Sequence, residues 1–314
     1  MTIDKKYIQK FAKTTQMGAY GASLFKGKGD KIGADKSAVD MMRKELNSID
    51  MNGKIVIGEG ELDDAPMLFI GEKLGNKNGE EFDIAVDPLE GTNFVAKNLP
   101  NALSVLAVTK KGNLFHAPET YMEKIAIGPG LPKRLLDLDN PVEKNIKLLS
   151  EAKNKPINKL TACILERDRH NKIIKILNSL NVNIKFITDG DILGVLLVAN
   201  KNSNVDIFLG IGGGPEGVLA AAALSCLDCQ MQTRLIFQNN IEKQRAIKMG
   251  ISELNKKYFI EDMVKGDVIF CATGITDGDL VKGIKDFTST FASETYVTHK
   301  SSKLSTIIKQ DLKK

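Results

Sequence analysis

The sequence of 314 residues contains no tryptophan, only 6% aromatic residues and three histidines. With so few aromatic side chains, we expect no stacking platform for bases or sugars. The histidines His116, His170 and His299 are single residues far apart in the chain, so an imidazole zinc site is not expected. We expect each of them to be structural or exposed.

Cysteine is also scarce. Four cysteines in a chain of this length do not make a disulfide scaffold. Cys226 and Cys229 form a C-x-x-C pair, but the pair closes an expected helix, where the helix dipole disfavours thiolates. No second C-x-x-C pair is present to complete a zinc site, so we expect core or near-core cysteines.

Long apolar runs are absent. The longest, at residues 218–227, is too short to cross a bilayer. The 44 basic and 39 acidic residues give a net charge of +5, and the lysines are scattered, which weakly indicates an anionic ligand and does not indicate nucleic-acid binding. We therefore expect a cytoplasmic protein that binds neither nucleic acid nor a membrane.

The chain has an ordinary globular composition, with 42% hydrophobic residues, and a length typical of two domains or one two-part fold. Apolar spacing in the first half predicts helices over 4–24 and 35–50 and strands over 54–58, 82–86 and 102–108. Residues 109–117 resemble a hairpin closed by Gly112 and Asn113. The first half is therefore expected to be α+β.

The second half begins with a predicted helix over 142–149, and beyond it strands and helices alternate. This order predicts an α/β half with a parallel or mixed sheet covered by helices, which includes a strand at 267–273. The linker at 154–158 sets the expected domains at 1–155 and 156–314. Residues 299–314 are expected to form a solvated, partly helical tail.

Acidic residues follow two predicted strands of the first half. They are Glu59, Glu61, Asp63 and Asp64 after the first strand, and Asp87 and Glu90 after the second. Open sheets bind ligands at the carboxyl ends of strands. Carboxylates that converge there repel one another unless a divalent ion neutralises them, and oxygen ligands suit Mg²⁺ or Mn²⁺. The alternative for each cluster is an ordinary turn, because turns favour such residues.

A glycine-rich segment raises a second possibility. Gly212, Gly214 and Gly217 spell G-x-G-x-x-G between a predicted strand and a predicted helix, the context of a dinucleotide-binding fingerprint. The next strand ends in Gln238 instead of an acid for the ribose hydroxyl, and Glu216 would lie against a pyrophosphate. A dinucleotide site is therefore not expected, although a helix N-terminus here still suits a phosphate.

The segment DPLEGT at residues 87–92 resembles the signature of the metal-dependent, lithium-sensitive sugar and inositol phosphatases. The motifs around it narrow the resemblance to the class II fructose-1,6-bisphosphatases. In chain order they are GKGDKIGAD, VIGEGELDDAPML, DPLEGT, NALSVLAV, APETYMEKIAIGPG, DGD, GIGGGPEG and ATGITDGDL, within residues 20–285. The resemblance implies a layered α-β-α-β-α sandwich.

The resemblance also implies roles for individual residues. The metal-binding acids fall on Asp35, Glu59, Asp87, Glu90 and Glu216. The catalytic residues are Thr92, whose hydroxyl would orient the attacking water, with Glu59 and Asp87. The sugar-phosphate site falls on Glu90, Gly91, Thr92, Tyr121, Arg167, Arg169, Asp189, Gly190, Asp191 and Gly213. Lys31 is a further candidate for contact with an anion.

This grouping makes chemical sense for a phosphatase. Phosphoryl transfer needs mainly positioning and charge stabilisation, so one threonine, a few carboxylates and metal ions can suffice. Arg167 and Arg169 are suited to hold the second, non-reacting phosphate, because a guanidinium donates two hydrogen bonds at once. The alternative for these arginines is a solvated turn after a strand.

The expected function is therefore Mn²⁺- or Mg²⁺-dependent hydrolysis of the 1-phosphate of fructose 1,6-bisphosphate to fructose 6-phosphate, a gluconeogenic step. Hydrolysis of sedoheptulose 1,7-bisphosphate, alone or alongside, is an alternative, because this sugar differs mainly in chain length between the phosphates. A non-catalytic sugar-phosphate sensor is another, but it would tolerate loss of Thr92 or a metal acid, and all are present. The resemblance also implies a homo-oligomer, a dimer or tetramer.

Overall fold

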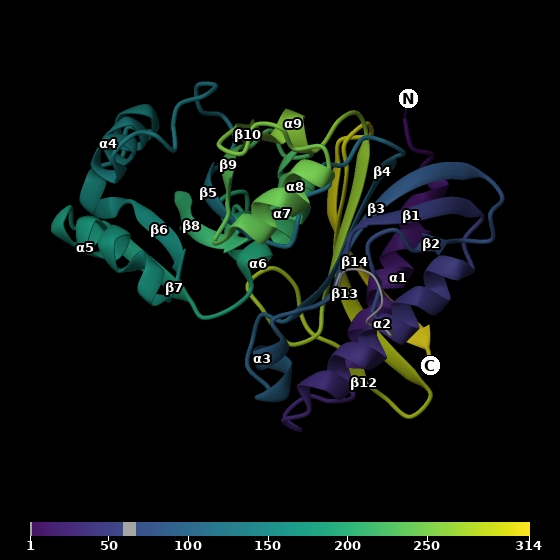
Figure 1. The fold of residues 1–314 in the computed structure, drawn as a ribbon. Helices are drawn as coiled ribbons and strands as arrows, with labels where there is room; N and C mark the ends of the chain where they lie inside the picture. The colour runs from purple at the N-terminus through teal and green to yellow at the C-terminus, as the bar shows by residue number, and fades with distance from the viewer. Residues whose placement is uncertain (1, 59–66) are drawn as a thin grey trace. The chain divides into compact units, whose positions relative to one another are not determined.

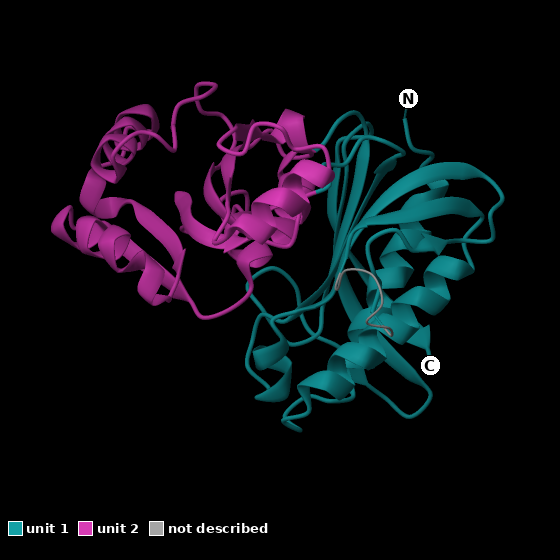
Figure 2. Cartoon of the chain, viewed as in Figure 1, with its two compact units in different colours: residues 1–116, 264–314 teal, residues 117–263 magenta. Residues whose placement is uncertain are grey.

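The computed structural model describes residues 2–58 and 67–314. The chain folds into two compact units, unit 1 with residues 1–116 and 264–314 and unit 2 with residues 117–263 (Figures 1 and 2). This division differs from the expected boundary at residue 155, which lies inside unit 2. The physical reason is that strands from the C-terminal end of the chain complete the sheet of unit 1, so this unit is discontinuous in sequence.

Unit 1 is built on one mixed sheet. Its helices are α1 (Lys6–Ser23), α2 (Lys31–Asn47) and α3 (Thr92–Ala96). Its strands are β1 (Met51–Ile57), β2 (Lys73–Leu74), β3 (Glu80–Glu90), β4 (Leu103–Lys110), β11 (Val268–Gly274), β12 (Lys285–Asp286), β13 (Thr290–His299) and β14 (Leu304–Lys313). The strand order is β12-β13-β11-β4-β3-β1-β2, with β14 paired to β13. Strands β1 and β3 are parallel, and the other pairs are antiparallel.

The predicted helices of this unit are confirmed, and they pack on the sheet through large side chains. The rings of Tyr7 and Phe11 of α1 pack edge to face against the ring of Phe82 of β3. The centroid of Phe82 lies 5.0 Å from that of Tyr7 and 5.9 Å from that of Phe11. Helix α2 begins earlier than its apolar spacing predicts, because the carboxylate of Asp30 accepts a 2.8 Å hydrogen bond from Gly33 N–H and caps the first turn.

The C-terminal segment is a β-hairpin, so the expected partly helical tail is wrong. Strand β14 pairs with β13 along its whole length, from Leu304 opposite His299 to Lys313 opposite Thr290. The apolar residues Leu304, Ile308 and Leu312 pack against the core. Apolar residues four positions apart lie on one face of a helix, and they also lie on one face of a strand. The spacing alone therefore does not distinguish a helix from a strand.

Two further predictions for the sheet are wrong. The predicted hairpin closed by Gly112 does not form, because the chain after β4 makes only an isolated bridge between Leu114 and Val264. The buried carboxylate of Asp83 holds this turn by accepting a 2.7 Å hydrogen bond from Gly112 N–H. Strand β11, expected in the sheet of the second half, lies in unit 1 between β4 and β13.

Unit 2 has its own mixed sheet. Its helices are α4 (Val142–Lys153), α5 (Asn171–Ser179), α6 (Asp191–Leu196), α7 (Gly214–Leu224), α8 (Asn240–Lys248) and α9 (Ile260–Met263), with 3-10 turns η1 (Ile157–Lys159) and η2 (Asp168–His170). Its strands are β5 (Tyr121–Ile127), β6 (Thr161–Leu165), β7 (Asn183–Ile187), β8 (Ile207–Gly213), β9 (Gln230–Ile236) and β10 (Lys257–Phe259). The order is β10-β9-β5-β8-β6-β7, and β6 is parallel to both β7 and β8.

Helices cover both faces of this second sheet. Ile125 and Ile127 of β5 pack in one core cluster with Ile146 of α4, whereas the neighbouring Met122 and Lys124 lie under α7. Successive side chains of a strand point to opposite faces, so α4 and α7 lie on opposite sides. The predicted mixed α/β class is confirmed in both units.

The cysteines lie in or near the core, as the sequence predicted. No disulfide links the cysteines of the described chain, and Cys163, Cys229 and Cys271 are buried. Burial raises the pKa of the Cys229 thiol to about 12, which makes it unreactive.

Among the described residues, no helix combines the length and apolarity needed to cross a membrane.

Candidate active site

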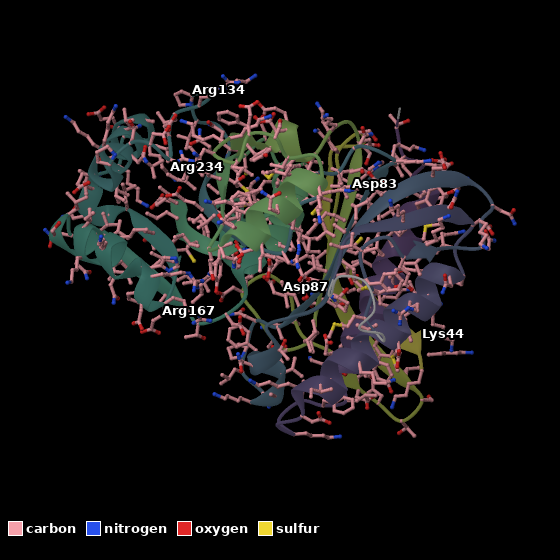
Figure 3. The ribbon with its side chains drawn as sticks, viewed as in Figure 1. Lys44, Asp83, Asp87, Arg134, Arg167 and Arg234 are labelled. Carbon is pink, nitrogen blue, oxygen red and sulfur yellow. The ribbon has the colours of Figure 1, made fainter. Side chains whose placement is uncertain are left out.

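The first group of predicted site residues lies where β3 ends in unit 1. The strand is buried through Val86, and its register against β4 shifts between Asp87 and Glu90, which marks a bulge. Asp87 is half-buried, and its Oδ1 accepts a 3.1 Å hydrogen bond from Leu89 N–H (Figure 3). The side chain of Glu90 is buried. Two carboxyl groups are therefore presented within four residues, with little water around them.

The chain then turns sharply at a glycine. Gly91 has φ 84° and ψ 50°, the left-handed region that side chains disfavour, and a Cβ here would lie 2.6 Å from Cδ2 of Phe94. Helix α3 begins immediately afterwards, with the half-buried Thr92 as its first residue. The N-cap of this helix is Gly91 itself, so Thr92 is not its cap. Its hydroxyl therefore does not serve as the N-cap of α3.

Helix α2 carries Asp35 and Lys31 near its start. It packs against both α3 and β3. Asp35 is half-buried and Lys31 is exposed, and residues four apart share one face of a helix. Unit 1 therefore places Asp35 on an element that packs directly against the elements that carry Asp87 and Thr92.

One predicted metal ligand and catalytic residue, Glu59, lies outside the described residues, as do Glu61, Asp63 and Asp64. Within residues 2–58 and 67–314, no three acidic, histidine or cysteine side chains are arranged to hold a metal ion. The test of whether a metal fits therefore depends on the surroundings of each described carboxylate.

In unit 2, the glycine-rich segment at the end of β8 leaves room for acidic side chains. A Cβ at Gly212 would lie 1.9 Å from Oδ2 of Asp191, and a Cβ at Gly213 would lie 1.9 Å from Oε2 of Glu216. Both distances are far shorter than any nonbonded contact. Glycine at these positions therefore allows two carboxyl groups to approach the backbone, which is a different use from the dinucleotide fingerprint that the spacing resembles.

A buried lysine accompanies these carboxyl groups. Lys124 of β5 is 1% exposed, and its Nζ forms an ion pair with Oδ2 of Asp191. The Oδ1 of Asp191 and the Oε2 of Glu216 are buried and have no hydrogen-bond partner within the described part of the chain. Burial raises the pKa of the Glu216 carboxyl, and this effect is opposed by the positive charge of Lys124.

A divalent cation fits the surroundings of Glu216. A buried carboxylate oxygen without a donor is costly, and a metal ion would satisfy it. The acids Asp35, Asp87, Glu90 and Glu216 offer oxygen ligands only, as Mg²⁺ and Mn²⁺ prefer.

The segment Asp189–Asp191 forms the entry to α6. Gly190 has φ 79° and ψ 62°, again left-handed, and its N–H donates a 3.2 Å hydrogen bond to Oδ1 of Asp189. Asp189 is half-buried and Asp191 is buried. The turn thus places two carboxyl groups beside Glu216, whose pKa both of them also raise.

The two arginines of the predicted phosphate site differ in their surroundings. Arg169 donates from Nε and Nη2 to the carbonyl of Ile211, at 3.0 and 2.8 Å, and its guanidinium lies 4.9 Å from the ring centroid of Tyr121. Tyr121 is itself paired in register with Gly213. Arg167, labelled in Figure 3, donates at 2.9 Å to the neighbouring carbonyl of Glu166, and within the described residues this is its one hydrogen bond. Arg169 is therefore held against the strand that carries Gly213, whereas Arg167 is not.

His170 fixes the position of this arginine loop. The N–H of Ile211 donates a 2.8 Å hydrogen bond to Nε2 of His170, so the proton lies on Nδ1, which donates to the carbonyl of Leu165 at 2.7 Å. Burial lowers the pKa of His170. The imidazole is therefore neutral and links the end of β6 to β8. The expectation of a structural histidine is confirmed here, and also for His299, which is buried against Asp267.

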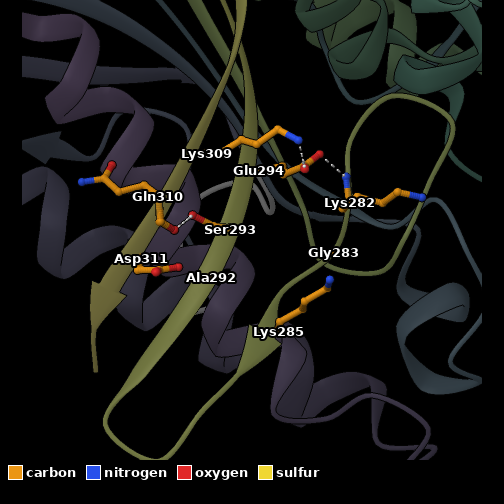
Figure 4. A pocket seen from close by; sticks show the side chains of 9 residues that line it. All are labelled: Lys282, Gly283, Lys285, Ala292, Ser293, Glu294, Lys309, Gln310 and Asp311. Atoms are coloured by element: carbon orange, nitrogen blue, oxygen red, sulfur yellow. Dashed lines mark hydrogen bonds and ion pairs between the residues drawn. The ribbon is translucent and has the colours of Figure 1, made fainter.

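Another hollow in unit 1, of about 300 Å³, does not contain these residues (Figure 4). It lies beside β13 and β14. Lys309 pairs with Oε1 of Glu294 at 2.7 Å, and Lys282 N–H donates to Oε2 of the same residue at 3.0 Å. The carboxylate of Glu294 is thus already neutralised, and none of the predicted site residues lines the hollow.

The chain is similar to known proteins along most of its length. The family model described as bacterial fructose-1,6-bisphosphatase, glpX-encoded, matches residues 5–311. The chain belongs to this family. The Escherichia coli K12 protein named fructose-1,6-bisphosphatase 1 class 2 is 43% identical over 289 residues, which cover 88% of this chain and 85% of the relative. A Synechococcus protein named D-fructose 1,6-bisphosphatase class 2/sedoheptulose 1,7-bisphosphatase is 39% identical over 326 residues. The match covers 96% of this chain and 94% of the relative.

Membership of the bacterial fructose-1,6-bisphosphatase family identifies the chain as a metal-dependent phosphoric monoester hydrolase. The Anabaena inositol monophosphatase structure aligns with 62% of this chain and 71% of its own, at 15% identity and a TM-score of 0.32. A score this low supports no argument about the site.

The sequence analysis missed Lys124 and the role of His170. A signal for Lys124 was present, because it alternates with the apolar Met122 and Ala126 on one face of the strand. A lysine at such a position requires a buried anionic partner. No signal in the sequence indicated which carboxylate this would be.

Proposed function

We propose that this family member hydrolyses the 1-phosphate of fructose 1,6-bisphosphate to fructose 6-phosphate and inorganic phosphate. The observation that supports this most directly is the end of β3, where Asp87, Glu90 and the hydroxyl of Thr92 lie within six residues around the bulge and Gly91. Such a group can hold cations and orient a water molecule without any covalent step.

Asp35, Glu59, Asp87, Glu90 and Glu216 would hold the metal ions, which we propose are Mn²⁺ or Mg²⁺. When bound, these ions would supply charge neutralisation at the phosphate and a water of lowered pKa. The hydroxyl of Thr92 would accept a hydrogen bond from the attacking water and thereby fix its direction. Arg169, held by Ile211 and Tyr121, presents its remaining N–H groups to the second phosphate.

A second candidate substrate is sedoheptulose 1,7-bisphosphate, because the cyanobacterial relative is named for both activities. We propose a gluconeogenic role in the cytoplasm for the first activity. A symmetric homo-oligomer, a dimer or tetramer, is the assembly we propose, and light scattering on the purified protein tests it.

Phosphate release from both bisphosphates, measured in parallel, tests the function. Chelation should abolish release, and Mn²⁺ or Mg²⁺ should restore it. Asp87→Asn should raise the metal concentration required, because it removes an anionic ligand. Glu81→Gln is the matched control, since Glu81 is exposed on the same strand and pairs with Lys111. Full turnover in chelator would refute the metal-dependent mechanism, and tight binding of both sugars without phosphate release would instead identify a sensor.

A further inference from the structure

Lys124 is a fully buried lysine in the middle of a strand. It lies in register opposite Gly210 of β8 and Thr233 of β9, and its side chain is 0% exposed. An ammonium group at such a position is retained only where it is paired, because burial of an unpaired charge is costly. Its partner is Asp191, at the start of α6.

The backbone around this pair is shaped to contain it. A Cβ at Gly212 would collide with the Asp191 carboxylate, and a Cβ at Gly217 would lie 3.0 Å from Cε of Lys124 and 2.4 Å from Sδ of Met122. The glycines of the segment 212–217 therefore leave room for both members of the pair. Larger residues would displace the lysine, the aspartate or both.

Only one oxygen of Asp191 is used by this ion pair. Oδ2 is bound to Lys124, whereas Oδ1 is buried without a hydrogen-bond partner in the described part of the chain. The residue is 8% exposed, so its position is fixed by its surroundings. A buried acceptor without a donor indicates a ligand group that donates a hydrogen bond to it.

We propose that Lys124 is a positioning residue for sugar binding. It holds Oδ2 of Asp191, so that Oδ1 is aimed at a hydroxyl of the sugar phosphate. The inference rests on the proposed function, because it takes the ligand to be a sugar phosphate. Lys124 does not touch the substrate and acts through Asp191.

The experiment compares Lys124→Met, Asp191→Asn and the double variant. Affinity for fructose 6-phosphate is measured by calorimetry, and kcat and KM are measured with fructose 1,6-bisphosphate. Lys124→Met should weaken fructose 6-phosphate binding and raise KM by about 10-fold or more, with kcat changed much less, because a binding contact is lost equally in the ground and transition states. The double variant should bind no more weakly than Asp191→Asn alone, because one residue acts through the other.

Lys155→Met is the matched control. Lys155 pairs with the buried Asp206 at 2.6 Å in the same unit, so this variant also removes a cation from a buried aspartate, which keeps a second ion pair with Lys153. It should lower thermal stability and leave KM and sugar affinity within about 2-fold of wild type. If Lys124→Met does not fold, Lys124→Gln replaces it, because its side chain is one bond shorter and uncharged and so cannot hold Oδ2 as the lysine does.

Two outcomes would overturn the inference. One is unchanged KM and affinity in Lys124→Met, or in Lys124→Gln if that variant is used. The other is a double variant whose losses multiply, because Lys124 would then act independently of Asp191. A wild-type protein that neither binds nor hydrolyses the sugar phosphates would refute the proposed function instead, so the two failures are distinguishable.

Discussion

The α-carbon of Gly213 lies so close to Glu216 that a methyl group on it would be 1.9 Å from the Oε2 of this carboxyl group. The backbone of Gly213, with φ −70° and ψ 146°, is ordinary extended chain that alanine tolerates. A substitution here therefore acts on the neighbouring carboxylate and not on the backbone.

Gly213→Ala should displace the flexible end of Glu216 and leave the fold intact. Because Glu216 is a proposed metal ligand, we expect the metal concentration for half-maximal activity to rise about 10-fold or more. A metal titration of phosphate release measures this, with circular dichroism and thermal unfolding to check the fold. An unchanged metal requirement would mean that Glu216 is not a ligand.

Thr92 begins α3 directly after the left-handed Gly91, and its hydroxyl does not cap that helix. Thr92→Ser should retain much of the activity, whereas Thr92→Val should lose about 100-fold in kcat with little change in KM. This is the pattern for an interaction made mainly in the transition state. Steady-state kinetics on both variants tests it, and a Val variant that binds metal and keeps its kcat would refute this role.

The two arginines should differ in their effects. Arg169→Ala should weaken use of fructose 1,6-bisphosphate relative to fructose 1-phosphate by about 1.5 to 3 kcal/mol, the range for a lost charged hydrogen bond. Arg167→Ala should have a smaller effect, because its guanidinium is bound only to the adjacent Glu166. The ratio of kcat/KM values for the two substrates measures this.

Arg134→Ala is the control for that experiment, since Arg134 is an exposed arginine of unit 2 that lies over the Phe259 ring. Equal losses on the bisphosphate and the monophosphate would show that Arg169 supports the fold or the reacting end of the sugar.

His170 should make stability depend on pH. Its pKa is lowered by burial, and Arg169 lowers it further while Asp191 opposes this. The unfolded chain therefore binds the proton more readily than the folded chain. This contribution to the free energy of unfolding is fully present above pH of about 6.5 and is lost as pH falls through the lowered folded pKa.

Urea unfolding between pH 5 and 8 measures this effect, with His170→Asn as the comparison. The variant should lose stability at neutral pH, because the Ile211 N–H and the Leu165 carbonyl lose their partner, at a cost of about 1 to 3 kcal/mol for each buried group. Its stability should also fall less steeply below pH 6.5. If the free energy of unfolding changed with pH equally steeply in the wild type and in His170→Asn, the pH dependence would come from groups other than His170.

The sequence by itself determined the local structure of the site. The buried run that leads to Asp87 follows from neighbouring residues, because an apolar run followed by turn residues is a local pattern. The helices α1, α2 and α4 were predictable for the same reason. The helix α3 that begins at Thr92 was not predicted. The resemblance of the motifs identified the family, and it supplied residue roles that local physics does not.

The tertiary structure determined those features that depend on contacts between residues distant in the sequence. Strand β14 is a strand because β13 pairs with it, although its apolar spacing of four fits a helix equally well. The boundary of unit 1 depends on β11 inserting beside β4, which no local pattern records. Lys124 and Asp191 are 67 residues apart, and only the folding of unit 2, in which α7 packs against both β5 and α6, makes them a buried pair. Burial and pairing are properties of the folded chain, so the positions that hold the site in place could not be read from the sequence.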